Sequence, residues 1–235
     1  MKLLISIAKP SEVGAALRGG ADIIDVKNPG EGSLGANFPW VIKEAKKIAR
    51  KKTLSAAIGD FDFRPGTASL AALGAAMAGA KYVKVGLKFD GKERAKEFLE
   101  HVSRAVKSVR GKKVVAAAYA DHERLGTISP FELLDVALDA GVDVVMVDTG
   151  LKDGRTTFEF MSDGELADFV SGAREAGMKT ALAGCLGIEH LPRIKKIAPD
   201  IVGVRSCVCG GSRNADVKEE LVKEFRRKLD EKKKD

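Results

Sequence analysis

Eight short apolar segments alternate with amphipathic segments along this chain of 235 residues. The apolar segments begin near residues 3, 22, 53, 81, 113, 142, 178 and 200. The amphipathic segments begin near Pro10, Phe38, Thr67, Lys92, Ser129, Ser162, Glu189 and Asp216. Such alternation is typical of α/β proteins in which helices connect parallel strands. At this length the pattern predicts a single (β/α)8 TIM barrel.

The ends of several amphipathic segments carry helix signals. Ser129 and Ser162 are each followed three residues later by a glutamate, which is the pattern of a capping box. A doubly wound open sheet is the alternative, but it usually has fewer strands and a nucleotide-binding fingerprint, which this sequence lacks. No low-complexity segment divides the chain, so we expect one domain over residues 1–235, with a charged helix end at about 226–235.

Composition excludes several classes of protein. The charged fraction of 31% and the absence of a long apolar run argue against membrane spanning. The apolar run near the N-terminus is short and is followed by Lys9 and Pro10, which favours a first strand over a signal peptide. A cytoplasmic location is therefore expected. The three cysteines are an odd number, so a disulfide framework is not expected.

The net charge of +7 raises the question of nucleic-acid binding. Much of the excess lies at the C-terminus, in Arg226, Arg227, Lys228 and Lys232 to Lys234. No nucleic-acid motif is present and tyrosine and tryptophan are scarce, so we do not expect nucleic-acid binding. A basic interior that serves anionic small substrates explains the charge equally well. Barrels of this size commonly associate, so we expect a homo-oligomer.

Two lysines lie at the ends of apolar strand segments, where lysine is uncommon. Side-chain alternation puts Asp25 and Lys27 on one face of their strand and Lys84 on the corresponding face of another. Because the apolar face packs against helices, these three side chains should point into the barrel. Burial lowers the pKa of a lysine, and a neutral amine can form a Schiff base with a carbonyl. The alternative is a structural ion pair, but buried pairs are weak sources of stability.

Further charged residues follow the other predicted strands, at the end where barrels have their active sites. Asp148 should face inward by the same alternation, and Lys152 lies in the loop that follows it, where it could cover the mouth or stay solvated. Lys9, Asp60 and His122 follow the first, third and fifth strands and are additional candidates. His122 could transfer protons or could cap its loop.

Glycine-rich segments follow the seventh and eighth predicted strands. Barrels often bind phosphate with these two loops, because glycines let backbone N–H groups approach an anion. A short helix beginning near Asn214 should add its positive end. The alternative is an ordinary glycine turn. The predicted phosphate site comprises Gly184, Cys185, Arg205, Ser206, Gly210 and Gly211.

The cysteines Cys185, Cys207 and Cys209 could in principle hold a metal. They lack the paired spacing of a zinc site, so small buried hydrophobic residues are the better interpretation. We predict no metal site and no cofactor.

Three motifs in these positions resemble one family over essentially the whole chain. They are Asp25-Val26-Lys27-Asn28-Pro29 with Gly32-Ser33-Leu34-Gly35-Ala36, then Lys84-Val85-Gly86-Leu87, then Asp148-Thr149-Gly150-Leu151-Lys152-Asp153-Gly154. The sequence is similar to (5-formylfuran-3-yl)methyl phosphate synthases, also called 4-(hydroxymethyl)-2-furancarboxaldehyde-phosphate synthases, of methanofuran biosynthesis. The first motif is distinctive, and the glycine-rich end is less so.

The resemblance implies a carbon–oxygen lyase that condenses two molecules of glyceraldehyde 3-phosphate into a furan aldehyde phosphate, with loss of phosphate and water. It implies that Lys27 forms the Schiff base and that Lys84 accepts a proton. It also implies that Asp25, Asp148 and Lys152 support catalysis. The residues alone leave open which lysine has which role.

Three other functions remain compatible with the sequence. One is a different Schiff-base (class I) aldolase that acts on another sugar phosphate. The second is a catalytically silent barrel that binds a phosphometabolite or a partner protein. The third is a metal-dependent isomerase that uses the cysteines.

Overall fold

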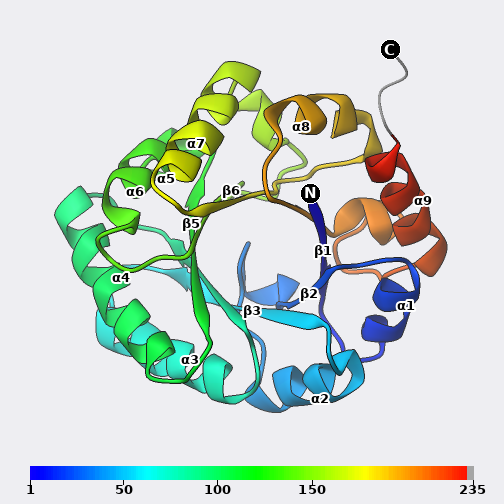
Figure 1. Ribbon diagram of the computed structural model, residues 1–235, viewed down its shortest axis with the longest axis horizontal. Coiled ribbons are helices and arrows are strands. Elements are labelled where there is room, and N and C mark those ends of the chain that lie inside the picture. Colours follow the sequence, from blue (N-terminus) through cyan, green and yellow to red (C-terminus); the bar gives the residue numbers. More distant parts are fainter. Residues whose placement is uncertain (232–235) are drawn as a thin grey trace.

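A closed barrel of eight parallel strands forms the centre of the computed structural model, which describes residues 1–231 (Figure 1). The strands are β1 (Lys2–Ile7), β2 (Ile23–Val26), β3 (Thr53–Phe61), β4 (Tyr82–Leu87), β5 (Lys113–Tyr119), β6 (Val144–Asp148), β7 (Lys179–Leu182) and β8 (Ile201–Val204). They follow one another around the barrel in chain order, and β1 closes it by pairing with β8. The predicted TIM barrel is confirmed.

Helices cover the outside of the barrel (Figure 1). They are α1 (Glu12–Arg18), α2 (Pro39–Ala49), α3 (Pro65–Met77), α4 (Lys92–Lys107), α5 (His122–Leu125), α6 (Pro130–Ala137), α7 (Asp163–Glu175), α8 (Leu191–Ile197) and α9 (Glu219–Asp230). The capping boxes predicted at Ser129 and Ser162 are confirmed at the starts of α6 and α7. Short 3-10 helices follow four strands: η1 (Pro29–Glu31), η2 (Thr157–Glu159), η3 (Ile188–His190) and η4 (Ser206–Val208).

The segment between η4 and α9 differs from the prediction. Residues 209–218 contain turns and no helix, so the prediction of a short helix beginning near Asn214 is wrong. The backbone carbonyls of Arg213 and Ala215 instead accept hydrogen bonds from the side chain of Arg205. Two carbonyls that would accept hydrogen bonds within a helix thus accept them from Arg205, the residue that follows β8.

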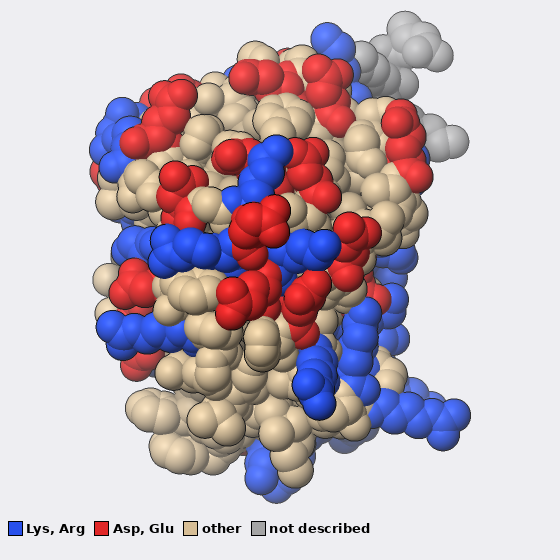
Figure 2. Space-filling model, turned by 90° about the vertical axis from the view of Figure 1, so that its left-hand side faces the viewer, with Lys and Arg blue, Asp and Glu red and all other residues tan. Residues whose placement is uncertain are grey.

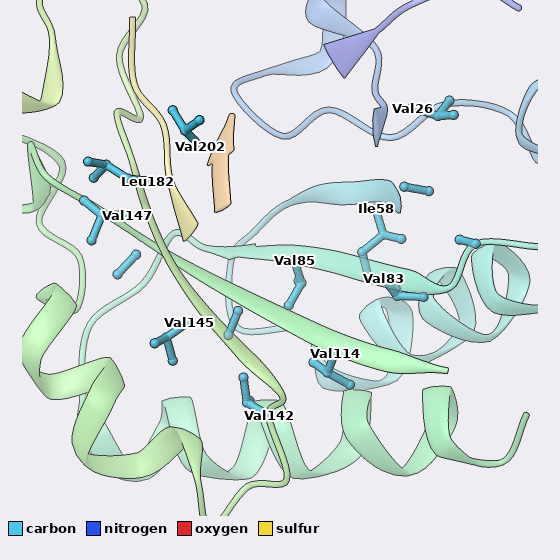
Figure 3. Packing of buried hydrophobic residues seen from close by; sticks show 14 of the residues in the cluster. Val26, Ile58, Val83, Val85, Val114, Val142, Val145, Val147, Leu182 and Val202 are labelled. Carbon is cyan, nitrogen blue, oxygen red and sulfur yellow. The ribbon is translucent and has the colours of Figure 1, made fainter. Parts of the chain in front are cut away.

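The outward faces of the strands carry the larger apolar core. Valine side chains of β4, β5 and β6 fill the space between these strands and the surrounding helices (Figure 3). Val83 and Val85 belong to this layer and are completely buried. Each such side chain stabilises the fold by about 1.5–3 kcal/mol relative to an exposed one. The outward position of both valines confirms that Lys84, which lies between them, points into the barrel.

A second apolar cluster fills the barrel interior below a charged layer. It includes Ile23 on β2, Tyr82 on β4 and Met146 on β6. Each of these residues is followed two positions later by a charged inward residue, which is Asp25, Lys84 or Asp148 respectively. The apolar cluster therefore forms a floor beneath the charges at the carboxyl ends of the strands.

The charged end of the last helix lies partly within the described residues. Arg226 forms ion pairs with Asp22 and Asp230 on the outside of the barrel. The rest of the predicted segment, residues 232–235, lies outside the described residues. Among the helices of residues 1–231, not one combines the length and apolar character needed to cross a bilayer.

Candidate active site

A cavity of about 360 Å³ opens at the carboxyl ends of the strands. Its lining includes Lys27, Lys84, Asp148 and Lys152, so four of the five predicted catalytic residues meet there. The fifth, Asp25, lies directly behind Lys84. These residues come from β2, β4 and β6 and from the loops that follow β2 and β6. We refer to this side as the lysine wall.

Lys84 and Asp25 form a completely enclosed ion pair. Lys84 Nζ donates to Asp25 Oδ2 at 2.7 Å, and the two side chains are 2% and 0% exposed. Ser6 Oγ donates to the same oxygen at 3.0 Å. Burial would raise the pKa of Asp25, but the charge and hydrogen bond of Lys84 outweigh burial and lower it. Asp25 is therefore a carboxylate, and Lys84 is its ion-pair partner.

Lys27 lies one residue beyond β2 and has a different environment. Its Nζ donates to the backbone carbonyl of Ser33 at 3.3 Å, and no carboxylate of residues 1–231 forms an ion pair with it. Burial lowers its pKa to about 7, and the nearby charges of Lys152 and Lys84 act in the same direction. The charges of Asp148 and Asp25 oppose this shift. A large fraction of Lys27 is therefore a neutral amine near neutral pH.

Asp148 and Lys152 form the second ion pair of the lysine wall. Lys152 Nζ donates to Asp148 Oδ1 at 2.8 Å and to Thr149 Oγ1 at 3.1 Å. Burial would raise the pKa of Asp148, but the charges of Lys152 and Lys27 lower it. The loop after β6 therefore folds over the mouth and brings Lys152 onto the cavity. Asp121 fixes this loop by accepting the backbone N–H groups of residues 150 and 151.

The opposite side of the cavity is built by the loops after β7 and β8, and we call it the glycine wall. Gly184, Cys185, Ser206 and Gly211 line the cavity there, whereas Gly210 does not. The φ angle of Gly184 is 100°, and an added Cβ would collide with Thr157 Oγ1.

The next residue of the glycine wall also has a positive φ angle. Cys185 has a φ angle of 51°, which is uncommon for a residue other than glycine. Such conformations cluster at functional sites, where surrounding structure maintains them. The sequence could not have revealed this strain.

Arg205 lines the cavity, but its guanidinium donates all its hydrogen bonds to other groups of the protein. Its N–H groups donate to the carboxylate of Glu12 and to the carbonyls of Ser6, Arg213 and Ala215. All five donors of an arginine are engaged in these contacts. Arg205 therefore joins β8 to β1, α1 and the loop before α9, and its side chain has no donor left for a phosphate.

The three additional candidates lie away from the cavity lining. Lys9 is exposed and forms an ion pair with Asp216 at 3.0 Å. His122 begins α5 and is half-buried. Asp60 accepts the backbone N–H of Leu34 at 3.0 Å and the hydroxyl of Tyr119, so it supports the loop after β2 from behind.

Sequence reasoning missed two residues of the site. Arg213 lines the cavity, and its Nη2 donates to the carbonyl of Gly32 at 2.6 Å. Arg213 lies in the glycine-rich segment after β8, and this position could have marked it as a candidate site residue. Glu12 is buried and accepts the backbone N–H of Val217 as well as Arg205. Its position in the first turn of α1 gave no sign of a partner about 200 residues away.

The cysteine thiols have an environment that opposes metal binding. Burial raises the pKa of Cys207 to about 12 and that of Cys209 to about 11, and it also raises the pKa of Cys185. Metal ligation requires the thiolate, which these shifts disfavour. Within residues 1–231, histidine, cysteine and carboxylate side chains form no group of three arranged to hold a metal ion.

The barrel and its charged cavity define a TIM-barrel protein with the site architecture of an enzyme. Solved structures that share the fold include the following two. One is 3-hexulose-6-phosphate synthase, with a TM-score of 0.69, 19% identity and coverage of 97% of this chain and 100% of that one. The other is the aldolase QR15, with a TM-score of 0.64, 15% identity and coverage of 97% and 94%.

The sequence comparisons identify the family. Residues 3–226 match the model of the 4-HFC-P synthase family, and the chain belongs to this family. It is 54% identical to the (5-formylfuran-3-yl)methyl phosphate synthase of Methanosarcina mazei, over 96% of this chain and 97% of that protein. It is 51% identical to the synthase of the same name from Methanocaldococcus jannaschii, over 96% and 98%. The resemblance stated from the motifs is confirmed.

Proposed function

We propose that the protein condenses two molecules of glyceraldehyde 3-phosphate into (5-formylfuran-3-yl)methyl phosphate through a Schiff base on Lys27. Atoms balance when one phosphate and two water molecules are released. On this proposal the protein is a carbon–oxygen lyase of methanofuran biosynthesis. Membership of the synthase family supports the product.

The observation that carries the mechanism is the contrast between two buried lysines. The pKa of Lys27 is lowered to about 7 by burial, whereas Lys84 forms an ion pair with Asp25 at 2.7 Å. A Schiff base requires a neutral amine as nucleophile and an acid to protonate the departing hydroxyl. On this proposal Lys27 is the nucleophile and Lys84 is the acid, and both line the same cavity.

The first half of the reaction uses both lysines. The neutral Lys27 amine attacks the aldehyde carbon, and the resulting carbinolamine loses water when Lys84 donates its proton. Lys84 is then a neutral amine and can accept the proton from the carbon next to the imine. The enamine that forms is the carbon nucleophile that attacks the second triose phosphate.

The second half needs further proton transfers for loss of phosphate and closure of the ring. Asp148 and Lys152 support these steps, because their 2.8 Å ion pair lines the same cavity and offers an acceptor and a donor. The backbone of the glycine wall, at Gly184, Cys185, Ser206 and Gly211, faces the space in which a phosphate group would lie. The scheme needs no metal or cofactor.

Product identification tests the reaction. The protein would be incubated with glyceraldehyde 3-phosphate alone, and the product would be analysed by ultraviolet absorbance and mass spectrometry. A furan aldehyde phosphate is expected. A linear sugar phosphate would instead indicate a different Schiff-base aldolase, and absence of any product would indicate a barrel that only binds phosphometabolites.

Borohydride trapping tests the mechanism. We expect one reduced triose adduct on the peptide that contains Lys27. Lys27→Arg keeps the charge but removes the usable amine, so both adduct and activity should be lost. Lys88→Arg is the matched control, because Lys88 is exposed just beyond β4 and does not line the cavity. Activity that survives in Lys27→Arg would exclude the Schiff base.

We also propose that the protein is a homo-oligomer in which the outer face of α3 meets a second copy. Helix α3 contains no charged residue, yet Leu70 and Met77 are 75% and 70% exposed. In Figure 2 charged side chains gather in the upper part of the view, and a wide uncharged area lies below, at the height of α3 in Figure 1.

An uncharged face suits contact with its own copy, because symmetry would bring like charges together on a charged one. A helix that is apolar all round is normally buried. Leu70→Glu together with Met77→Glu should therefore reduce the mass measured by light scattering to that of a monomer. A wild-type monomer would contradict the proposal.

Three further properties expected from the sequence are predictions. They are a single domain over residues 1–235, a cytoplasmic location and the absence of nucleic-acid binding. Filter binding of labelled RNA and DNA at physiological salt would test the last of them.

A further inference from the structure

Two of the basic side chains on the cavity have no carboxylate partner among residues 1–231. Lys84 pairs with Asp25, and Lys152 pairs with Asp148. Lys27 and Arg213 form no such pair. Because Lys27 is largely neutral near neutral pH, Arg213 is the cation that favours an anionic ligand in the cavity.

The two basic groups donate hydrogen bonds to adjacent peptide carbonyls. Arg213 Nη2 donates to the carbonyl of Gly32 at 2.6 Å, and Lys27 Nζ donates to the carbonyl of Ser33 at 3.3 Å. We call residues 32–34 the strap. The strap comes from the loop after β2, whereas Arg213 comes from the loop after β8. The strap therefore connects the lysine wall to the glycine wall.

Contacts on both sides fix the position of the strap. Ser33 Oγ donates to the carbonyl of Thr149 at 2.8 Å, and the N–H of Leu34 donates to the carboxylate of Asp60 at 3.0 Å. Gly32 has a φ angle of 126°, and an added Cβ would collide with Asp60. The two carbonyls are thus held in place, and each holds one basic group, the Lys27 amine or the Arg213 guanidinium.

The guanidinium is suited to a phosphate ester. An arginine has five N–H donors in a planar fork that matches phosphate oxygens, and the bond to Gly32 uses one of them. Burial lowers the pKa of Arg213, which indicates that its charge is partly removed from water. An anion beside it would offset that loss of solvation.

Resting on the function proposed above, we propose that Arg213 binds the phosphate group of the triose phosphate whose carbonyl carbon is attached to Lys27. The strap carbonyls bring the amine and the guanidinium to one cavity, where a single triose phosphate could contact both. Arg213 is thereby a substrate-specificity residue that selects phosphorylated over neutral aldehydes.

Binding of inorganic phosphate and of glyceraldehyde 3-phosphate to Arg213→Gln, measured by calorimetry, tests this assignment. Charged hydrogen bonds of this kind change affinity by about tenfold to hundredfold. Both ligands should bind more weakly by that factor, and Arg213→Lys should lie between Arg213→Gln and wild type. Arg104→Gln is the control, because Arg104 is exposed on α4, away from the cavity lining. Phosphate affinity in Arg213→Gln equal to that in Arg104→Gln would overturn the proposal, as would a wild-type protein that binds no phosphate.

Borohydride trapping with neutral glyceraldehyde separates specificity from structure. Arg213→Gln should form the Lys27 adduct with glyceraldehyde as well as wild type does, but should need a higher concentration of glyceraldehyde 3-phosphate. Equal losses with both aldehydes would assign Arg213 a structural role in the strap. If the wild type binds phosphate through Arg213 but makes no furan aldehyde, the proposed reaction fails while the assignment of Arg213 stands.

Discussion

The two walls of the cavity are built in different ways. The lysine wall consists of long side chains that project from or just beyond strands, and its carboxylates are paired with lysines at 2.7 and 2.8 Å. The glycine wall consists mainly of loop backbone, with left-handed residues at Gly184 and Cys185. Strands fix side chains that perform proton transfers, and loops present backbone that can surround an anion. Substitutions on the first wall should therefore affect chemistry, and those on the second should affect binding or loop structure.

The largest effect is expected from Lys84→Met on the lysine wall. Loss of a proton donor and acceptor typically lowers kcat by about 10²–10⁴-fold. KM should change little, because the phosphate-binding backbone is untouched. Steady-state kinetics with glyceraldehyde 3-phosphate measures both constants, with Lys88→Met as the control. A change confined to KM would mean that Lys84 only binds substrate.

Arg205→Leu on the glycine wall should act on stability instead. Removal of this arginine leaves Glu12 as an unpaired buried carboxylate, which costs about 3–5 kcal/mol of unfolding free energy. Arg227→Leu breaks the exposed pair with Glu231 and should cost less than about 1 kcal/mol. Urea denaturation compares the two variants. Similar losses in both would show that the buried pair has no special role.

If Arg205→Leu does not fold, Arg205→Lys keeps a charge beside Glu12 and provides a second measurement. Its affinity for inorganic phosphate should match wild type, because the donors of Arg205 are all used by the protein. A clear loss of phosphate affinity in the folded variant would assign Arg205 to the substrate.

Gly184→Ala should affect both binding and stability. An added methyl group would collide with Thr157, and the φ angle of 100° is unfavourable for alanine, at a cost of about 1–3 kcal/mol. Affinity for inorganic phosphate should fall while trapping of neutral glyceraldehyde on Lys27 persists. Gly74→Ala on α3 is the control, because a Cβ there meets open space. Unchanged phosphate affinity would mean that the backbone at Gly184 does not bind the phosphate group.

The smallest effect is a pH dependence of stability that comes from Lys27. Its pKa is about 7 in the folded protein and about 10.5 in the unfolded chain. Below pH 7 both states hold the proton. Above pH 7 the unfolded chain holds a proton that the folded protein lacks, so the unfolding free energy should rise with pH by up to about 1.4 kcal/mol per unit.

Urea denaturation of wild type and Lys27→Met between pH 7 and 9 measures this contribution. The difference between the two proteins should grow with pH, and Lys88→Met should run parallel to wild type. Parallel curves for Lys27→Met would contradict the lowered pKa.

The lysine wall was largely predictable from the sequence. Alternation along a strand decides which way Asp25, Lys84 and Asp148 point, and the apolar neighbours that face the helices reveal the alternation. The sequence allowed a buried ion pair but did not tell which lysine would pair with Asp25, and the 3.3 Å contact of Lys27 with Ser33 was not predictable. Such contacts depend on where each side chain lies in the folded protein, and segments far apart in the sequence set these positions.

The glycine wall was less predictable, because loop conformation depends on contacts that have no period in the sequence. Gly184 and Gly211 line the cavity and Gly210 does not, and the helix expected near Asn214 is absent. Arg205 was predicted to bind phosphate, yet its donors reach Glu12 and backbone carbonyls far away in the chain. Arg213 donates to the carbonyl of Gly32, which lies 181 residues away in the chain.

The contact between Glu12 and Arg205 has a consequence for how the protein is made. Glu12 leaves the ribosome early, whereas Arg205 and the backbone N–H of Val217 emerge almost last. Until then β1 lacks its neighbour β8, and both β1 and β7 present open edges to other chains. A truncated chain should therefore aggregate rather than retain partial activity, and cells that make this protein depend on complete translation for every working copy.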